Sequence, residues 1–257
     1  MLRLLTAAAI ALALLLPGTG PAAAQETDAP QSSAMSAAER ETLRREIRAY
    51  LLENPEVILE AINILEERRA EAARQNDGEL VAEHAEALFQ DDHSWVGGNP
   101  EGDVTVVEFS DYRCVFCKRA HPILRELLAE DGDIRLVVKE FPILGPQSVV
   151  AGRMAIAAAA LDPELYRELN GALMTHEGEM SEVVAYRIAG RVGYDVAELK
   201  ARAASEETEE ALRQNYELAR ALGLQGTPSF VIGEQVIRGF VEKDEMADAV
   251  AEARTGG

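Results

Sequence analysis

Two cysteines separated by two residues are the part of this 257-residue sequence best suited to do chemistry. They are Cys114 and Cys117, in the stretch DYRCVFCKRAHP (111–122). Cys114 lies where a predicted strand gives way to a helix, and unpaired N–H groups and the helix dipole favour a thiolate in the first turn of a helix. Cys117 follows one turn later on the same face. The pair suits an enzyme in which Cys114 attacks a substrate disulfide and Cys117 resolves the mixed disulfide.

Other uses of two cysteines compete with this interpretation. A structural disulfide is a poor alternative, because closing so small a loop restricts the unfolded chain very little. Structural zinc needs four protein ligands, and the whole chain has two cysteines and four histidines. A chaperone-like binding protein with an incidental disulfide is a further alternative. A soft-metal site, for example for Cu(I), is also compatible with the sequence. Its candidate ligands are Cys114, Cys117 and His121, which share one helical face. Met174, His176 and Met180, which lie close to one another in a later stretch of the sequence, are further candidates.

The first 24 residues have the layout of a secretory signal peptide. A basic start is followed by an apolar run over residues 4–16, and small residues at Ala22 and Ala24 favour cleavage after Ala24. The apolar run is too short to span a bilayer. We therefore expect an exported, periplasmic protein. Its formal net charge of −20 argues against nucleic acid as a partner.

Hydrophobic patterning predicts the elements that position the cysteines. A buried strand is expected at 104–109, a helix from the cysteines to about residue 130, and a second strand at 133–141. Residues 148–222 have a helical pattern only. The last segments expected are a hairpin with strands 229–232 and 235–238, and a helix at roughly 242–253.

Residues 36–90 are predicted to be a separate helical region, preceded by a disordered leader at residues 25–35. Ser36 and Glu39 fit a capping box that begins one helix, and Asn54–Pro55 ends it and begins the next. The apolar stripes of these helices are too small to form a core of their own. They must pack against the rest of the chain or against other copies of it, and we favour self-association.

These features together resemble the DsbA-type branch of the thioredoxin-like oxidoreductases over residues 91–257. The likeness rests on the CxxC motif at a strand-to-helix junction, on a proline inside the following helix (Pro122), and on the helical block 148–222. It implies an α/β, thioredoxin-like fold with a helical insertion at about 148–222, preceded by an all-helical N-terminal region. It also implies an enzyme with no cofactor beyond the redox-active Cys114–Cys117 disulfide, and with no metal.

The same resemblance assigns roles to residues outside the CxxC motif. Glu108 matches a buried acid that lies beneath the active site and tunes the thiol pKa, and Lys139 on the next strand is a candidate partner for it. Thr227–Pro228 matches a cis-proline loop that binds the client peptide. The residues between the cysteines are Val115 and Phe116, without a histidine, so we expect a milder oxidant than DsbA.

The stretch YLLENPEVILEAI (50–62) resembles the oligomerisation segment of the ScsC-like proteins, DsbA relatives linked to copper tolerance. It implies a homo-oligomer assembled through residues 36–90, with three subunits. The prediction is a periplasmic protein thiol–disulfide oxidoreductase that forms or isomerises disulfides in exported client proteins, with a lean towards isomerase, and that exchanges electrons with a membrane redox partner. The alternatives are a monomeric DsbA-like dithiol oxidase, or a copper-handling protein that uses the same cysteines.

Overall fold

The computed structural model describes residues 35–255. The predicted signal peptide and all but Met35 of the predicted leader lie outside this range. The chain divides into two compact units, residues 1–60 and 61–257, which are described separately. Among residues 35–255, no helix combines the length and the hydrophobicity that crossing a membrane requires.

The described part of the first unit consists of α1 (Ala37–Glu53) and the start of α2 (Glu56–Glu83). The predicted capping box is confirmed: Ser36 Oγ accepts a hydrogen bond from the Glu39 N–H (3.3 Å), and Glu39 Oε2 accepts one from the Ser36 N–H (2.8 Å). None of the residues of α1 is buried, and its apolar stripe is about half exposed within this chain.

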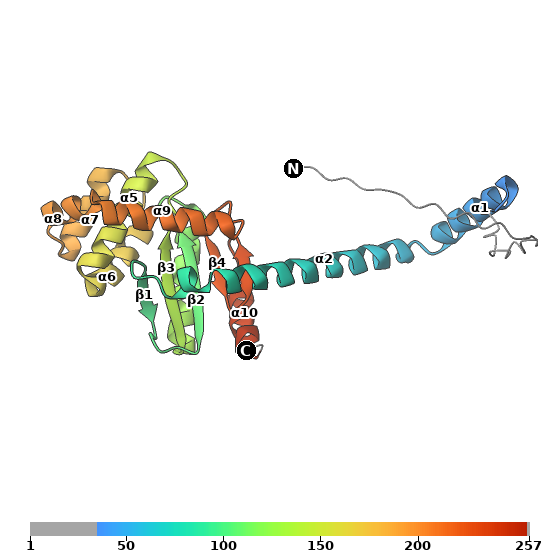
Figure 1. The fold of residues 1–257 in the computed structure, drawn as a ribbon, viewed down its shortest axis with the longest axis horizontal. Coiled ribbons are helices and arrows are strands. Elements are labelled where there is room, and N and C mark those ends of the chain that lie inside the picture. The colour runs from blue at the N-terminus through green and yellow to red at the C-terminus, as the bar shows by residue number, and fades with distance from the viewer. Residues whose placement is uncertain (1–34, 256–257) are drawn as a thin grey trace, which may run out of the picture. The chain divides into compact units, whose positions relative to one another are not determined.

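The second unit is built on a five-stranded mixed sheet with the order β1-β3-β2-β4-β5 (Figure 1). Strands β2 and β3 are parallel, and the other neighbouring pairs are antiparallel. Strand β1 was not predicted from the sequence, because it is short and contains two glycines. The strands are β1 (Trp95–Gly98), β2 (Val104–Ser110), β3 (Ile134–Glu140), β4 (Ser229–Ile232) and β5 (Gln235–Arg238).

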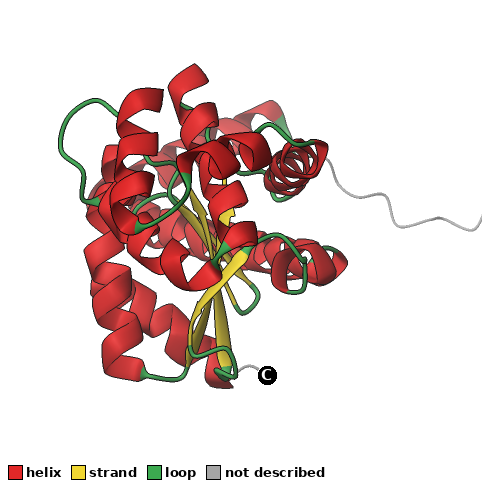
Figure 2. Cartoon of the chain, turned by 90° about the vertical axis from the view of Figure 1, so that its left-hand side faces the viewer, coloured by secondary structure: helices red, strands yellow, loops and turns green. Residues whose placement is uncertain are grey.

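Helices cover both faces of this sheet (Figure 2). One face packs against α4 and α10, and the other packs against the C-terminal part of α2, α3 and α9. The block from α5 to α8 forms an adjoining core of its own, which reaches the cysteines. This arrangement confirms the predicted α/β fold with a helical insertion. The helices are α3 (Ala85–Phe89), α4 (Val115–Asp131), α5 (Pro146–Leu161), α6 (Pro163–Met174), α7 (Glu182–Val192), α8 (Val196–Ala203), α9 (Glu206–Ala221) and α10 (Lys243–Thr255).

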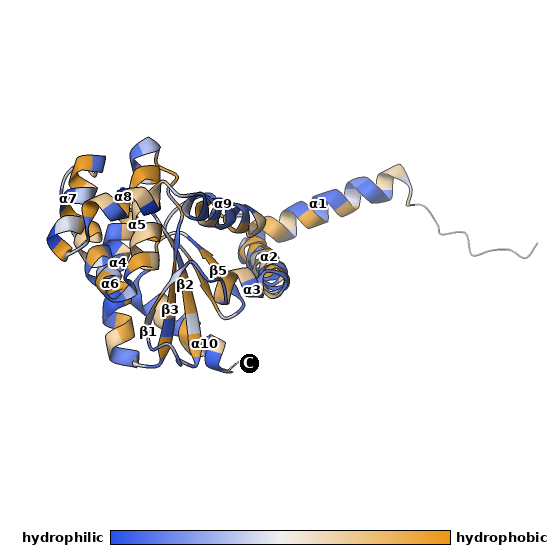
Figure 3. Cartoon of the chain, turned by 60° about the vertical axis from the view of Figure 1, so that its left-hand side comes forward, coloured by the Kyte–Doolittle hydropathy of each residue, from blue (hydrophilic) through white to orange (hydrophobic). Residues whose placement is uncertain are grey.

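The alternation of side chains along β2 and β3 decides which polar groups lie near the cysteines. Figure 3 shows both strands mainly in the orange of hydrophobic residues. Because successive side chains of a strand point to opposite faces, Glu108 and Glu140 lie on the face covered by α4, together with Val106 and Val138. Lys139 lies on the opposite face of the sheet.

Candidate active site

Cys114 begins the helix that carries both cysteines. It is the N-cap residue of α4, and its Sγ accepts a hydrogen bond from the Cys117 N–H (N···Sγ 3.4 Å). The turn before it is held by Asp111, whose carboxylate accepts hydrogen bonds from the Arg113 N–H (2.8 Å) and the Leu144 N–H (3.1 Å). The sequence therefore places a thiol at the positive end of a helix and fixes the loop that presents it.

The two thiols have opposite pKa shifts. The hydrogen bond from the Cys117 thiol, together with N–H groups of the first helical turn, lowers the pKa of Cys114 to about 6. The pKa of Cys117 is raised, because its thiol is hydrogen-bonded to Cys114, fully buried and close to Glu108. Both sulfurs belong to free thiols, so the structure describes the dithiol form. At neutral pH Cys114 is the better nucleophile and Cys117 keeps its proton.

The loop before β4 completes the environment of Cys114. The Thr227–Pro228 peptide bond is cis, and the Thr227 carbonyl accepts a hydrogen bond from the Cys114 thiol (Sγ···O 3.1 Å). Because β4 pairs with β2 in the sheet, residues 113 positions apart in sequence become neighbours. The structure thus brings together Cys114, Cys117, Thr227 and Pro228, the four residues to which the sequence assigned catalysis and substrate binding.

Glu108 lies on β2 beneath α4 and is almost completely buried. Burial raises its pKa to about 7, against a hydrogen bond from Ser110 Oγ (3.0 Å) that lowers it. The suggested pairing of Glu108 with Lys139 is wrong. In the β2–β3 register Lys139 is the partner of Phe109, so its side chain lies on the other face, where its ammonium binds the Asp91 carboxylate and Ser94 Oγ.

A second buried acid near the site was missed by the sequence reasoning. Glu140 Oε1 accepts hydrogen bonds from Tyr112 Oη (2.7 Å) and Tyr166 Oη (2.8 Å), and Asn170 Nδ2 donates to Tyr112 Oη (3.3 Å). Burial raises the pKa of Glu140 to about 8, and the charge of Glu108 adds to this rise. Two sequence features could have indicated this cluster: an acidic residue at the end of an apolar strand, and a tyrosine two positions before the first cysteine.

Val115, Phe116 and Phe240 form an apolar surface beside Cys114, and the Arg119 guanidinium lies against it. Val115 and Phe116, the two residues between the cysteines, are both more than half exposed. The Phe116 ring lies 6.1 Å from the ring of Phe240, and the Arg119 guanidinium lies over both rings, 5.7 Å and 4.5 Å from their centroids. This surface can hold an extended, partly apolar peptide against the thiol.

Among the candidate soft-metal ligands, Cys114, Cys117, Met174 and Met180 belong to one buried cluster, and Met174, His176 and Met180 line one pocket, whereas His121 lines a different one. Met174 and Met180 are buried in the core of the helical block, and the His176 carbonyl accepts a hydrogen bond from Lys118 Nζ (2.5 Å). Burial lowers the pKa of His121 to about 4, and its Nε2 lies near α6. In the part of the chain that the structure describes, no three His, Cys, Asp or Glu side chains are placed to hold a metal ion.

Comparison with known proteins gives two family matches. A family model described as DSBA-like thioredoxin domain matches residues 105–251, which is more than half of the chain. A second model, described as Copper resistance protein ScsC N-terminal domain, matches residues 39–72.

Solved structures and curated proteins give similar matches. A thioredoxin-like oxidoreductase from Silicibacter pomeroyi DSS-3 is 42% identical, with a TM-score of 0.64, over 67% of this chain and 98% of that one. A linker-deletion mutant of Proteus mirabilis ScsC is 25% identical, with a TM-score of 0.67, over 88% of this chain and 100% of that one. The Na(+)/H(+) antiporter NhaA 1 of Salinispora arenicola is 29% identical over 64% of this chain, and the match spans 25% of the antiporter's length.

Proposed function

The chain belongs to the DsbA-like thioredoxin domain family, and from this premise we propose that it is a protein thiol–disulfide oxidoreductase with a lean towards disulfide isomerisation. One observation carries the proposal. Cys114 is the N-cap residue of α4, and the pKa of its thiol is lowered to about 6. Its sulfur lies directly against the Thr227 carbonyl of the cis-proline loop. A thiolate in that position is available to attack, and the loop offers backbone groups to an incoming peptide.

The reaction follows from the difference between the two thiols. The Cys114 thiolate attacks one sulfur of a client disulfide, and the other client sulfur leaves as a thiolate. Cys117 then gives up its proton, with Glu108 as the acceptor, and attacks the Cys114 sulfur. The second client thiolate leaves, the client disulfide is reduced and the Cys114–Cys117 pair is oxidised. In isomerisation a client thiolate displaces Cys114 instead, so the client changes its pairing and the enzyme returns as a dithiol.

The lean towards isomerisation rests on the residues around Cys114. With Val115 and Phe116 between the cysteines, no imidazolium stabilises the Cys114 thiolate, so the disulfide is expected to be a milder oxidant than that of DsbA. The exposed ring of Phe116, next to the partly buried ring of Phe240, gives a misfolded client with uncovered apolar segments a surface to bind. The clients are cysteine-containing exported proteins, and the periplasmic location rests on the predicted signal peptide.

Self-association through the N-terminal region is part of the proposal. Leu43, Ile47 and Tyr50 recur on one face of α1 and are 45%, 50% and 56% exposed, with no buried residue elsewhere in that helix. Burying the exposed half of such side chains would stabilise an assembly by roughly 1 kcal/mol each. Other copies of the same helix are the partner of matching chemistry, and the match to an ScsC N-terminal domain supports this choice. A membrane redox partner would keep the dithiol form populated.

The test is the reactivation of a reporter enzyme whose disulfides have been scrambled. The purified chain is expected to restore activity in the presence of a small reducing thiol. Cys114→Ser is expected to abolish reactivation. Cys117→Ser is expected to accumulate mixed disulfides with the reporter that are visible on non-reducing gels. The isomerase assignment fails if the chain oxidises a reduced reporter but does not reactivate a scrambled one. The assigned roles of the cysteines fail if Cys117→Ser forms no adduct.

A further inference from the structure

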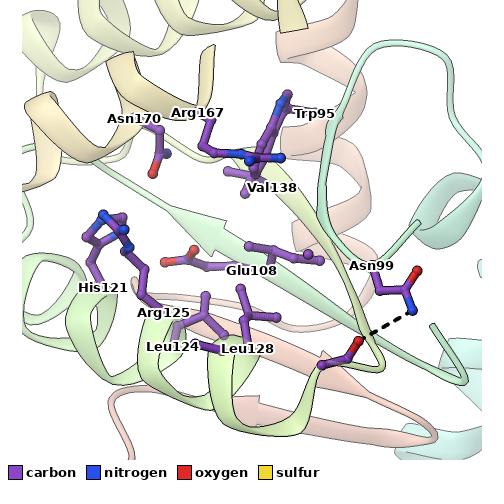
Figure 4. A pocket seen from close by; sticks show the side chains of 14 residues that line it. Trp95, Asn99, Glu108, His121, Leu124, Arg125, Leu128, Val138, Arg167 and Asn170 are labelled. Carbon is purple, nitrogen blue, oxygen red and sulfur yellow. Dashed lines mark hydrogen bonds between the residues drawn. The ribbon is translucent and has the colours of Figure 1, made fainter. Parts of the chain in front are cut away.

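A cavity of about 370 Å³ lies between α4 and the sheet (Figure 4). Its walls come from α4, α6, β1 and the α4-facing side of the sheet. The volume is within the range in which proteins bind small organic molecules. No step of the proposed reaction uses this space, although Glu108 forms part of its lining.

One part of the cavity wall is apolar and held in place. Trp95 lines it on one side, and Leu124, Leu128 and Val138 line it elsewhere. The Trp95 indole N–H donates to the Pro163 carbonyl (2.8 Å), and its ring packs 5.1 Å from that of Tyr166. The aromatic wall is therefore fixed without a ligand, so an apolar body can enter with little reorganisation.

The polar part of the lining carries positive charge that is not neutralised. Arg125 and Arg167 line the cavity and are exposed, and neither forms an ion pair with a carboxylate among residues 35–255. In a chain with a formal net charge of −20, two such arginines at one cavity favour an anion. Guanidinium groups suit carboxylate and similar oxyanions, because they offer paired N–H donors.

A buried histidine without a hydrogen-bond partner adds a second, independent observation. His121 is 8% exposed and lines the cavity, and its Nε2 has no partner in the structure. A side-chain atom placed on Gly171 would lie 3.8 Å from Arg125 Nη1 and 3.9 Å from His121 Nε2, so both groups lie close to α6. A neutral imidazole with its proton on Nε2 can donate to an oxyanion there.

Glu108 makes the occupancy of this cavity depend on pH. Its ionised carboxylate would repel an anion in the same space, whereas its protonated form would not. Binding of an anion therefore favours the protonated form of Glu108, and protonation of Glu108 in turn raises the affinity for the anion. The other titratable or charged groups near Glu108 are Cys114 at the N-cap of α4, Cys117, His121 and Arg125 on α4, Glu140 on β3, and Arg167 on α6.

We propose that this cavity binds a small amphipathic organic anion, an apolar body with one acidic head, and that the bound anion keeps the proton on Glu108. The apolar body lies between Trp95 and the leucines of α4, and the head lies between the two arginines. The consequence for catalysis rests on the proposed function. A Glu108 that already carries a proton cannot accept the one from Cys117, so the bound anion slows closure of the Cys114–Cys117 disulfide.

Trp95 allows the binding to be measured directly, because it is the one tryptophan of the chain. The reduced full chain is titrated with phenylbutyrate and with its uncharged analogue phenylbutyramide, and Trp95 emission is recorded at pH 6 and pH 8. The pKa of Glu108 is raised to about 7, so the protonated fraction falls about tenfold over this range and the affinity for phenylbutyrate is expected to fall about tenfold with it. The affinity for phenylbutyramide is expected not to change with pH.

Three variants identify the groups responsible. Replacing both cavity arginines, Arg125→Gln with Arg167→Gln, is expected to remove the preference for the acid over the amide. Arg187→Gln with Arg191→Gln makes the same charge change on exposed positions of α7 and is expected to leave that preference unchanged. Glu108→Gln is expected to keep binding and to abolish its pH dependence.

The proposal is overturned if phenylbutyrate gives no saturable change in Trp95 emission at pH 6, or if the two arginine pairs behave alike. It is also overturned if binding is equally strong at pH 6 and pH 8. A separate arm measures disulfide exchange at pH 7 with and without saturating phenylbutyrate, and slower exchange with the ligand is expected. If the chain shows no exchange even without ligand, the proposed function fails, while the Trp95 titration still decides whether the cavity binds the anion.

Discussion

Cys114 and Cys117 lie one helical turn apart and yet differ in the property that governs their chemistry. Cys114 caps the helix and has its pKa lowered to about 6, whereas Cys117 is fully buried and has its pKa raised. The difference follows from position, since only the first turn of a helix has free N–H groups. Glu108 contributes to the difference between the two pKa values, because its negative charge opposes the ionisation of Cys117.

Glu108 makes the stability of the dithiol form depend on pH. Its pKa is raised from the ordinary 4.5 to about 7, so between these values the native state holds a proton that the unfolded chain has released. Stability therefore falls as pH rises through this window, by roughly 3 kcal/mol in total. Glu108→Gln is expected to raise the free energy of unfolding relative to wild type at pH 8 by about this amount and to have little effect on it at pH 4.

Urea unfolding curves of the reduced protein at the two pH values measure this difference. Glu101→Gln, in an exposed loop, is the matched control and is expected to follow wild type at both. Equal effects of Glu108→Gln at pH 4 and pH 8 would mean that this carboxyl titrates normally in the folded protein.

Strand β3 shows how one element serves two parts of the fold. Its consecutive residues Lys139 and Glu140 point to opposite faces, Glu140 towards the tyrosines near the active site and Lys139 towards the loop that precedes β1. Burial would raise the pKa of Asp91, but the charge and hydrogen bond of Lys139 outweigh it and leave the pKa below its ordinary value. This ion pair fastens the loop to the sheet.

Removing one partner of that pair leaves a buried charge uncompensated. Lys139 is fully buried, so Asp91→Ala is expected to lower the free energy of unfolding by about 3–5 kcal/mol. The double variant Asp91→Ala with Lys139→Met removes both charges and is expected to recover most of the loss. Asp92→Ala, at a fully exposed neighbour, is the control and is expected to change stability by less than about 0.5 kcal/mol. A loss as small for Asp91→Ala as for Asp92→Ala in urea unfolding would rule out this role.

The sequence predicted elements better than it predicted contacts between them. Periodicity and capping located α1, α4, the two central strands and the C-terminal hairpin, because those signals are local. The bond between Lys139 and Asp91 and the cluster of Glu140 with Tyr166 depend on strand register and on helix packing across many residues, which no local pattern carries. Family resemblance, rather than spacing, is what pointed to Thr227 and Pro228 as neighbours of Cys114.

At the scale of the whole molecule, the two units have different physical characters. The second unit has a buried core on both faces of its sheet, whereas α1 in the first has no buried residue at all. A helix in a protein takes most of its stability from the packing of its apolar face rather than from helix propensity. The proposed self-association would supply that cover and would hold several catalytic units close to one client.

Two aspartates placed in the stripe are expected to dissociate the assembly. Leu43→Asp with Ile47→Asp should sediment as a single chain, whereas wild type should sediment as a multiple of it. Arg45→Asp with Arg48→Asp puts the same residues on the opposite side of α1 and is expected to leave the assembly intact. A wild-type protein that sediments as a single chain at micromolar concentration would contradict self-association through this helix.

The most direct test of the central claim is the pH dependence of alkylation of the reduced protein by iodoacetamide, with the modified cysteine identified by mass spectrometry. Cys114 is expected to react first, with a rate that rises with an inflection near pH 6, while Cys117 stays protected. An inflection near the ordinary value of 9.0, or prior modification of Cys117, would contradict the assignment of Cys114 as the attacking thiolate.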